Sequence, residues 1–220
     1  MDKENEYLFL IGIDKDDRIF DNTTNQREIT RFSKVFKNVI FEFIKMENIK
    51  KGHVTIMWNK LYNIAYERDY EYFYQCGDDI IFTTTGWINA SIKKLKDNND
   101  IGLTGPMNNN SRIMTQAFVS RKHYEIFGWF FPEEIINWGC DDWYNMLYHP
   151  KYLYPLNNHL AANVGGNPRY DINDNKNFRG TSHFDFARNT NTLRENVNII
   201  ANKHKELLEN YITHNNTTTT

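Results

Sequence analysis

The chain has 220 residues, a length that fits one domain with a hydrophobic core of its own. Its formal net charge is −2, so we expect no broad electrostatic attraction of the whole chain to nucleic acid or to anionic membranes. No stretch approaches 18 consecutive apolar residues, so the sequence predicts no membrane span. The first six residues are polar and do not resemble a secretory signal, so we expect a cytoplasmic protein.

The first half of the chain alternates short apolar runs with amphipathic segments. The predicted strands are residues 7–13, 53–58, 72–76 and 101–104. The predicted helices between them are residues 26–49, 61–68 and 87–95. This order is typical of an α/β protein with a mostly parallel sheet.

The second half is less regular, and we expect one domain over residues 1–214. Helical spacing predicts helices at residues 120–127, 141–148 and 193–212, with an apolar and aromatic stretch at 152–164. Residues 171–180 are polar and are predicted to form a mobile loop, and the low-complexity tail 215–220 is predicted to be disordered.

The two cysteines, Cys76 and Cys140, lie far apart and do not form a CxxC pair. This arrangement favours neither a disulfide framework nor a zinc site, and it favours a reducing compartment.

Three acidic groups follow apolar segments. They are Asp14 with Asp16 and Asp17, Asp78 with Asp79, and Asp141 with Asp142. The carboxyl ends of parallel strands meet at one sheet edge, where clustered carboxylates repel one another unless a cation such as Mg²⁺ or Mn²⁺ joins them. Such a cation suits a substrate that carries a diphosphate. Taken singly, each group also fits a structural role, as turn residues or as acidic residues at a helix N-terminus.

The ordered set of motifs resembles the GT-A glycosyltransferases, in particular the family-2-like group. Residues 72–80 resemble the strand and DxD-type motif of these enzymes. Asn59 and Ala65 resemble the asparagine and alanine of the helix that precedes this motif. Residues 11–14 are similar to the strand whose terminal aspartate contacts the nucleotide base, and residues 138–143 to the acidic pair that supplies the catalytic base. The segment 102–124 resembles the acceptor side. The likeness covers about residues 7 to 185 and is closest to glycosyltransferase-like proteins of large DNA viruses.

The resemblance implies a Rossmann-like mixed sheet flanked by helices, and an inverting hexosyltransferase that depends on Mn²⁺ or Mg²⁺. The donor would be a nucleotide-sugar, with a UDP-sugar expected, and the acceptor would be a hydroxyl group of a glycan or protein. The reaction would take place in the cytoplasm, and in the host's cytoplasm if the protein is viral.

The resemblance also implies roles for individual residues. Asp79 would be the principal metal ligand, Asp78 would bind the metal or the donor ribose, and Asp14 and Asp17 would hold the base and ribose. Asp142 would be the general base, with Asp141 as the alternative. The remaining candidates lie later in the chain: His183 for the metal shell, Arg169 or Arg179 for the diphosphate, and Trp138 and Trp143 for sugar stacking or core packing.

Two departures from the family pattern keep other functions open. The first β-α unit of the fold is expected to be missing ahead of residue 7, and Gly77 replaces the first aspartate of the usual acidic triplet. A non-catalytic module that binds sugar or protein is therefore the main alternative, and a sheet edge left unpaired would favour a homo-oligomer. A nucleotidyltransferase would show a Gly-rich basic loop near the N-terminus, and a two-metal nuclease or phosphatase more His and Glu at the strand ends; neither is visible.

Overall fold

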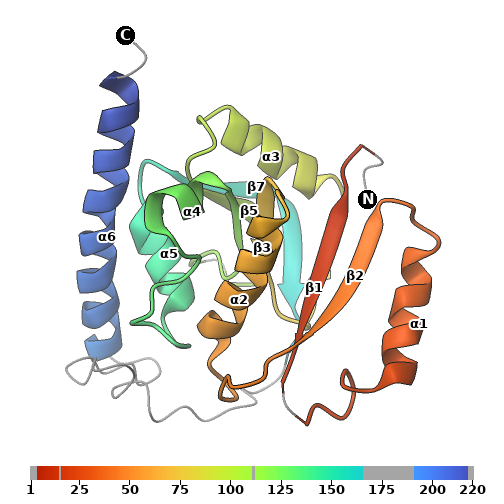
Figure 1. Cartoon of the computed structure of the whole chain (residues 1–220). Helices are drawn as coiled ribbons and strands as arrows, with labels where there is room; N and C mark the ends of the chain where they lie inside the picture. Colours follow the sequence, from red (N-terminus) through yellow and green to blue (C-terminus); the bar gives the residue numbers. More distant parts are fainter. Residues whose placement is uncertain (1–3, 15, 111, 166–190, 218–220) are drawn as a thin grey trace.

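The computed structural model describes residues 4–14, 16–110, 112–165 and 191–217 (Figure 1). Its strands are β1 (Tyr7–Ile13), β2 (Val39–Lys45), β3 (Tyr72–Gln75), β4 (Ile80–Phe82), β5 (Leu103–Met107), β6 (Ala117–Ser120) and β7 (Leu153–Asn163). Its helices are α1 (Thr23–Ser33), α2 (Val54–Glu67), α3 (Trp87–Lys96), α4 (Lys122–Phe127), α5 (Cys140–Tyr148) and α6 (Asn191–Thr217). The predicted α/β class is confirmed.

The strands form two hydrogen-bonded groups. β1 and β2 make a parallel pair, and the other strands form a five-stranded sheet in the order β3-β6-β5-β7-β4. β5 and β7 are parallel, whereas β6 runs antiparallel to both β3 and β5, and β4 antiparallel to β7. β3, β5 and β7 therefore point the same way, so the loops that follow them meet at one edge of a mixed sheet.

Helices cover this sheet, and α1 lies at the outer edge of the molecule beyond β2 (Figure 1). α6 packs along α5 and α4. The core beneath these helices is rich in aromatic side chains, and its largest fully buried members are Trp143, Tyr144, Tyr148 and Phe131. α5 thus holds its N-terminus rigidly against the sheet, since five of its residues are buried.

Several predicted elements are confirmed, including the strand at 7–13 and the helices that became α3 and α5. The predicted helix at 26–49 is wrong beyond residue 33, because residues 39–45 form β2 against β1. The predicted strand at 53–58 is also wrong: it is the first part of α2, whose single helix also contains residues 61–67. A short run of apolar residues is compatible with the periodicity of a helix and with that of a strand. Whether a neighbouring strand is available for pairing decides which of the two forms.

The short strands β4 and β6 were not predicted. Helix α6 continues through Thr217 into the segment expected to be disordered, while residues 171–180 and 218–220 lie outside the described residues. The expected lack of a β-α unit ahead of β1 stays a prediction.

Within the described residues, no helix has the length and apolar character needed to cross a membrane. Cys76 and Cys140 are both free thiols.

Candidate functional site

The loops that follow β3, β5 and β7 are joined to each other at the carboxyl edge of the sheet. The backbone N–H of Val164, just after β7, donates to the carbonyl of Asp79, 2.9 Å away. Asn109, in the loop after β5, donates its amide to the Asn163 carbonyl and accepts from the Asn163 N–H, at 3.0 and 3.1 Å. These bonds fix the loop with the Asp78–Asp79 pair to the loop that joins β5 to β6.

Asp79 is held close to two glycines from different parts of the chain. A Cβ atom on Gly77 would lie 2.5 Å from Asp79 Oδ1, and one on Gly165 would overlap Asp79 Oδ2. With the Asp79 carboxylate in this position, only glycine can be accommodated at positions 77 and 165. Gly77, which departs from the usual acidic triplet, thus makes room for the carboxylate that follows it. Asp78 is exposed.

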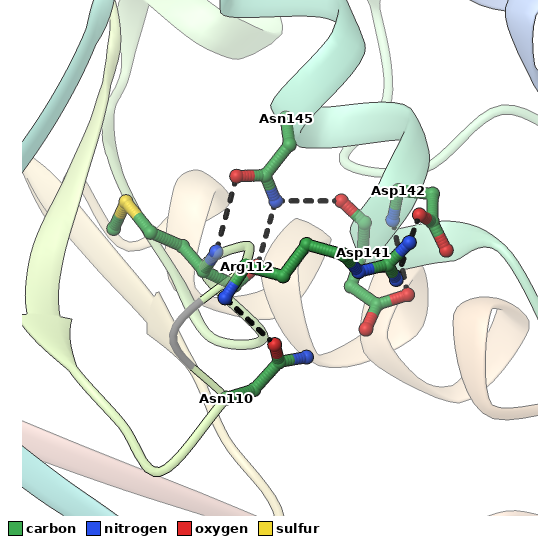
Figure 2. Close-up of polar contacts among 6 residues, drawn as sticks. Asn110, Arg112, Asp141, Asp142 and Asn145 are labelled. Carbon is green, nitrogen blue, oxygen red and sulfur yellow. Dashed lines mark hydrogen bonds and ion pairs between the residues drawn. The ribbon is translucent and has the colours of Figure 1, made fainter.

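The loop after β5 is anchored to α5 by Asn145, which is buried (Figure 2). Its Oδ1 accepts from the Met114 N–H at 3.1 Å, and its Nδ2 donates to the carbonyls of Met114 and Asp141 at 2.7 and 2.8 Å. Every polar atom of the Asn145 amide therefore serves to hold the loop against the first turn of the helix.

This anchor places Arg112 beside Asp142. The Arg112 backbone N–H donates to Asn110 Oδ1, and its guanidinium lies 3.3 Å from Asp142 Oδ1 (Figure 2). The Arg112 side chain is 57% exposed and that of Asp142 only 18%. One long contact to a half-exposed arginine contributes at most about 1 kcal/mol, so the pair can open readily when a ligand competes for either partner.

Asp141 differs from Asp142 in its surroundings. Its Oδ1 accepts from the Asp142 backbone N–H at 3.0 Å, and it lines a small hollow with Gln75, Gln116 and Tyr144. Burial, with a smaller contribution from the charge of Asp142, raises the pKa of Asp141 to about 6. A carboxyl group with this pKa is mainly ionised at neutral pH and is a stronger base than an ordinary aspartate, which suits it to accept a proton from a substrate.

The first acidic group lies in the loop after β1, and its members have structural contacts of their own. Asp17 Oδ1 accepts from the N–H groups of Ile19 and Phe20 at 2.8 and 2.9 Å, which closes a turn ahead of α1. Asp16 has a φ of 66° in the same turn. Asp14 directly follows the last residue of β1. The structure gives Asp17 a turn-forming role, and the predicted roles of Asp14 and Asp17 toward a nucleotide stay predictions.

Two further residues from the sequence have clear structural roles. Trp143 is fully buried, and its Nε1 donates to His204 Nδ1 on α6 at 3.2 Å, so of the two roles considered for it the structure supports core packing. Asn59 accepts from the N–H groups of Phe130 and Phe131 and donates to the Phe131 carbonyl. Trp138 is partly buried against the same core. His183, Arg169 and Arg179 lie outside the described residues.

Asp78 and Asp79 are the candidate metal ligands among the described residues. Within residues 4–14, 16–110, 112–165 and 191–217, no three His, Cys, Asp or Glu side chains converge on one point. Asp78 and Asp79 nevertheless offer two adjacent carboxylates, the hard oxygen ligands that Mg²⁺ and Mn²⁺ prefer, at a strand end with an exposed side. These two carboxylates fit Mg²⁺ or Mn²⁺ as ligands if water or the phosphates of a substrate fill the remaining coordination positions of the cation.

Sequence reasoning missed Arg112, the Asn109–Asn163 pair and Gly165. A signal was present for Arg112 and Asn109, because the polar run Asn108-Asn-Asn-Ser-Arg112 directly follows strand β5, but not for Asn163. Gly165 gave no such signal, since its importance comes from contact with Asp79, which lies 86 residues earlier in the chain.

No protein-family model matches this chain, and no curated protein matches it in sequence.

Proposed function

We propose that the chain is a metal-dependent glycosyltransferase of the GT-A type, which moves a sugar from a nucleotide-sugar donor to an acceptor hydroxyl with inversion. The observation that carries this proposal is the connected carboxyl edge. Backbone and amide hydrogen bonds run from Asp79 through Asn163 and Asn109 into the loop whose Arg112 contacts Asp142. Two acidic pairs that are about 60 residues apart in sequence thereby lie at the same edge.

The two pairs divide the work of the reaction. Asp78 and Asp79 would hold Mn²⁺ or Mg²⁺, which supplies charge neutralisation for a departing nucleoside diphosphate. Asp14 in the loop after β1 would contact the nucleotide, with a UDP-sugar as the expected donor.

Of the α5 pair, Asp141 is the better general base because its raised pKa suits proton transfer near neutral pH. Asp141 takes the proton of the acceptor hydroxyl as the oxygen attacks the anomeric carbon, and the bond from that carbon to the diphosphate oxygen breaks. The nucleoside diphosphate leaves with the bonding electrons. Asp142, beside the Arg112 guanidinium, would orient the acceptor. This assignment favours Asp141, the alternative base that the resemblance implied, over Asp142, the residue it implied first.

The test is nucleotide binding and release with Mn²⁺ and a panel of UDP-, GDP- and TDP-sugars, measured by thermal shift and by the nucleotide released. We expect one nucleotide to raise the melting temperature in a metal-dependent way, and Asp79→Ala to abolish that shift. Asp97→Ala is the matched control, since Asp97 is an exposed aspartate that pairs with Lys93 on α3. If no donor shifts the parent protein, the enzyme proposal fails and a non-catalytic module of the same fold takes its place.

The base is identified by the pH dependence of turnover. With Asp141 as the base, Asp141→Asn loses about 100-fold or more of kcat, and the acidic limb of the parent profile has its midpoint near pH 6. Asp142→Asn then retains the limb and changes KM more than kcat. The reverse pattern would return the base to Asp142.

A further inference from the structure

Helix α1 and the turn after it form an unusually exposed part of the molecule. No residue of α1 is buried, whereas each of the other described helices buries at least two. Figure 1 shows α1 at the rim of the molecule, covered by no other helix. The chain therefore presents this helix to a partner or to solvent.

Large apolar side chains are concentrated on this part. Phe32 and Val35 are 70% and 74% exposed, the highest values among the exposed large hydrophobic residues. The exposed large apolar residues from the end of β1 to the start of β2 are Ile19, Phe32, Val35, Phe36 and Ile40, the last of which is the second residue of β2. Singly exposed apolar residues are ordinary, but five within 22 residues of the chain indicate a contact surface.

Basic side chains alternate with these apolar residues. Residues 18–37 contain five basic residues, Arg18, Arg27, Arg31, Lys34 and Lys37, and two acidic ones, Asp21 and Glu28. This segment has a net charge of +3, although the whole chain has −2. In the part of the chain that the structure describes, none of the five forms an ion pair. We call the five basic and five apolar residues together the α1 surface.

The shape of the α1 surface is that of a convex helix with a hollow on its charged side. The hollow, about 500 Å³, is lined by Thr24, Arg27, Glu28, Thr30, Arg31 and Lys34. The exposed apolar residues Phe32, Val35 and Phe36 lie at the C-terminal end of the helix and in the turn that follows. The basic side chains along this open hollow can contact anionic headgroups, while the exposed apolar side chains can enter the layer beneath the headgroups.

We propose that the α1 surface binds the face of a membrane that contains anionic lipids. A second copy of the chain is a poorer occupant, because two-fold symmetry would place five unneutralised cations opposite the same five. A nucleic acid or an acidic protein would satisfy the charges but would leave Val35 and Ile19 without an apolar partner. The predicted absence of a membrane span does not conflict with this proposal, because the protein would lie on the bilayer and would not cross it.

The test is co-sedimentation of the full chain with vesicles, one set of pure phosphatidylcholine and one with about a third phosphatidylserine. We expect binding to the anionic vesicles that weakens as salt is raised, and little binding to the neutral ones. Arg31→Glu with Lys34→Glu should weaken binding at least about 10-fold. Phe32→Ser with Val35→Ser should also weaken it at least about 10-fold, since each buried apolar side chain contributes to insertion.

Two matched controls separate this surface from general effects of charge and hydrophobicity. Lys94→Glu with Lys96→Glu reverses two exposed lysines on α3, and Ile199→Ser removes an exposed apolar residue from α6. Both should leave vesicle binding unchanged. The four positions substituted on the α1 surface are all exposed, so thermal melting should show folded variants.

Three outcomes would overturn the proposal. The first is equal binding to neutral and anionic vesicles, or to neither. The second is loss of binding in the control variants to the same extent. The third is tighter binding to polyglutamate or to single-stranded DNA than to the anionic vesicles, unaffected by the serine substitutions, which would assign the surface to an acidic protein or a nucleic acid. None of these measurements needs a nucleotide-sugar, so they stand apart from the test of transferase activity.

Discussion

Gly165 lies against the Asp79 carboxylate so closely that a methyl group at position 165 would overlap Asp79 Oδ2. The obstacle would be the end of a flexible side chain, so the carboxylate can turn away at little cost to the fold. Gly165→Ala should therefore change the melting temperature little and weaken Mn²⁺ binding about 10-fold or more, because a displaced ligand loses its geometry. Electron paramagnetic resonance of free Mn²⁺ measures the affinity directly.

A double-mutant cycle shows whether Gly165 acts through Asp79. In an Asp79→Ala background, Gly165→Ala should have no further effect on Mn²⁺ affinity. An equal loss in both backgrounds would mean that Gly165 affects the site by another route. If the parent protein itself binds no Mn²⁺, the proposed metal site is wrong, and the role of Gly165 has no bearing on that result.

The position of Asp79 illustrates what the sequence could predict. An apolar run that stops at Gly77-Asp-Asp places carboxylates at the carboxyl end of a strand, and β3 ends at Gln75 as this rule requires. Asp141 and Asp142 have a different local signal, since acidic residues are favoured in the first turn of a helix such as α5. The roles of Gly165 and Asn163 could not be predicted. They depend on the end of β7 lying beside the loop after β3, which is a tertiary relationship without a local signal in the sequence.

The mistaken elements have a similar cause. Residues 34–38 contain no glycine or proline, so nothing local separates α1 from β2, and Val35, Phe36 and Val39 keep helical spacing across the boundary. The structure ends the helix at Ser33 because residues 39–45 bury more by pairing with β1, where Phe41 stacks on Phe9 with ring centroids 4.8 Å apart. The spacing of apolar residues gives no information about this long-range pairing between β1 and β2, so it could not predict the end of the helix.

Asp141 should make the stability of the protein depend on pH. Its pKa rises from 3.8 to about 6 on folding, so the native state holds this proton more tightly than the unfolded state. The contribution of Asp141 to stability is therefore favourable below about pH 4, falls as pH rises to about 6, and stays unfavourable above that. Asp141→Asn should stabilise the protein by ~1–3 kcal/mol at pH 7.5 and by much less at pH 4.

Urea denaturation of the parent and of Asp141→Asn at both pH values measures this difference. The asparagine Oδ1 can still accept from the Asp142 N–H, so the variant removes the charge and keeps the bond. Asp142→Asn, one residue along the same helix turn, is the control. A stabilisation that does not change between pH 4 and pH 7.5 would show that Asp141 is not titrating in this range.

Two buried histidines should give the opposite slope in acid. Burial lowers the pKa of His123 to about 3 and that of His204 to about 4. The Phe130 carbonyl can only accept, so His123 Nε2 donates to it and Nδ1 accepts from the Tyr148 hydroxyl. Both rings are neutral in the native state, whereas the unfolded chain binds protons below about pH 6.5. Each histidine should therefore cost about 1.4 kcal/mol of stability per pH unit between about pH 6 and pH 4.

The substitution His204→Gln separates titration from packing. Glutamine offers an oxygen to the Trp143 Nε1–H but does not titrate, so the variant should lose stability less steeply in acid than the parent. His214→Gln, the same substitution on the exposed end of α6, is the matched control. Parallel curves for the parent and His204→Gln between pH 6.5 and pH 4.5 would contradict a buried neutral His204.

Asn145 should be the most sensitive single position of the site for both folding and loop order. Asn145→Ala leaves the N–H and carbonyl of Met114 without their partners in a buried place, which should cost about 2–4 kcal/mol of unfolding free energy. Asn98→Ala, which removes one exposed hydrogen bond from the Asn98 amide to the Lys94 carbonyl, should cost less than about 0.5 kcal/mol.

The same substitution, Asn145→Ala, should also loosen the loop after β5. Once Met114 is released from α5, Arg112 is no longer held beside Asp142. Amide hydrogen exchange at Met114 should then accelerate at least about 10-fold beyond the change at Leu103 in β5. Equal acceleration at both amides would mean that the variant loosens the whole domain and that Asn145 does not specifically anchor this loop.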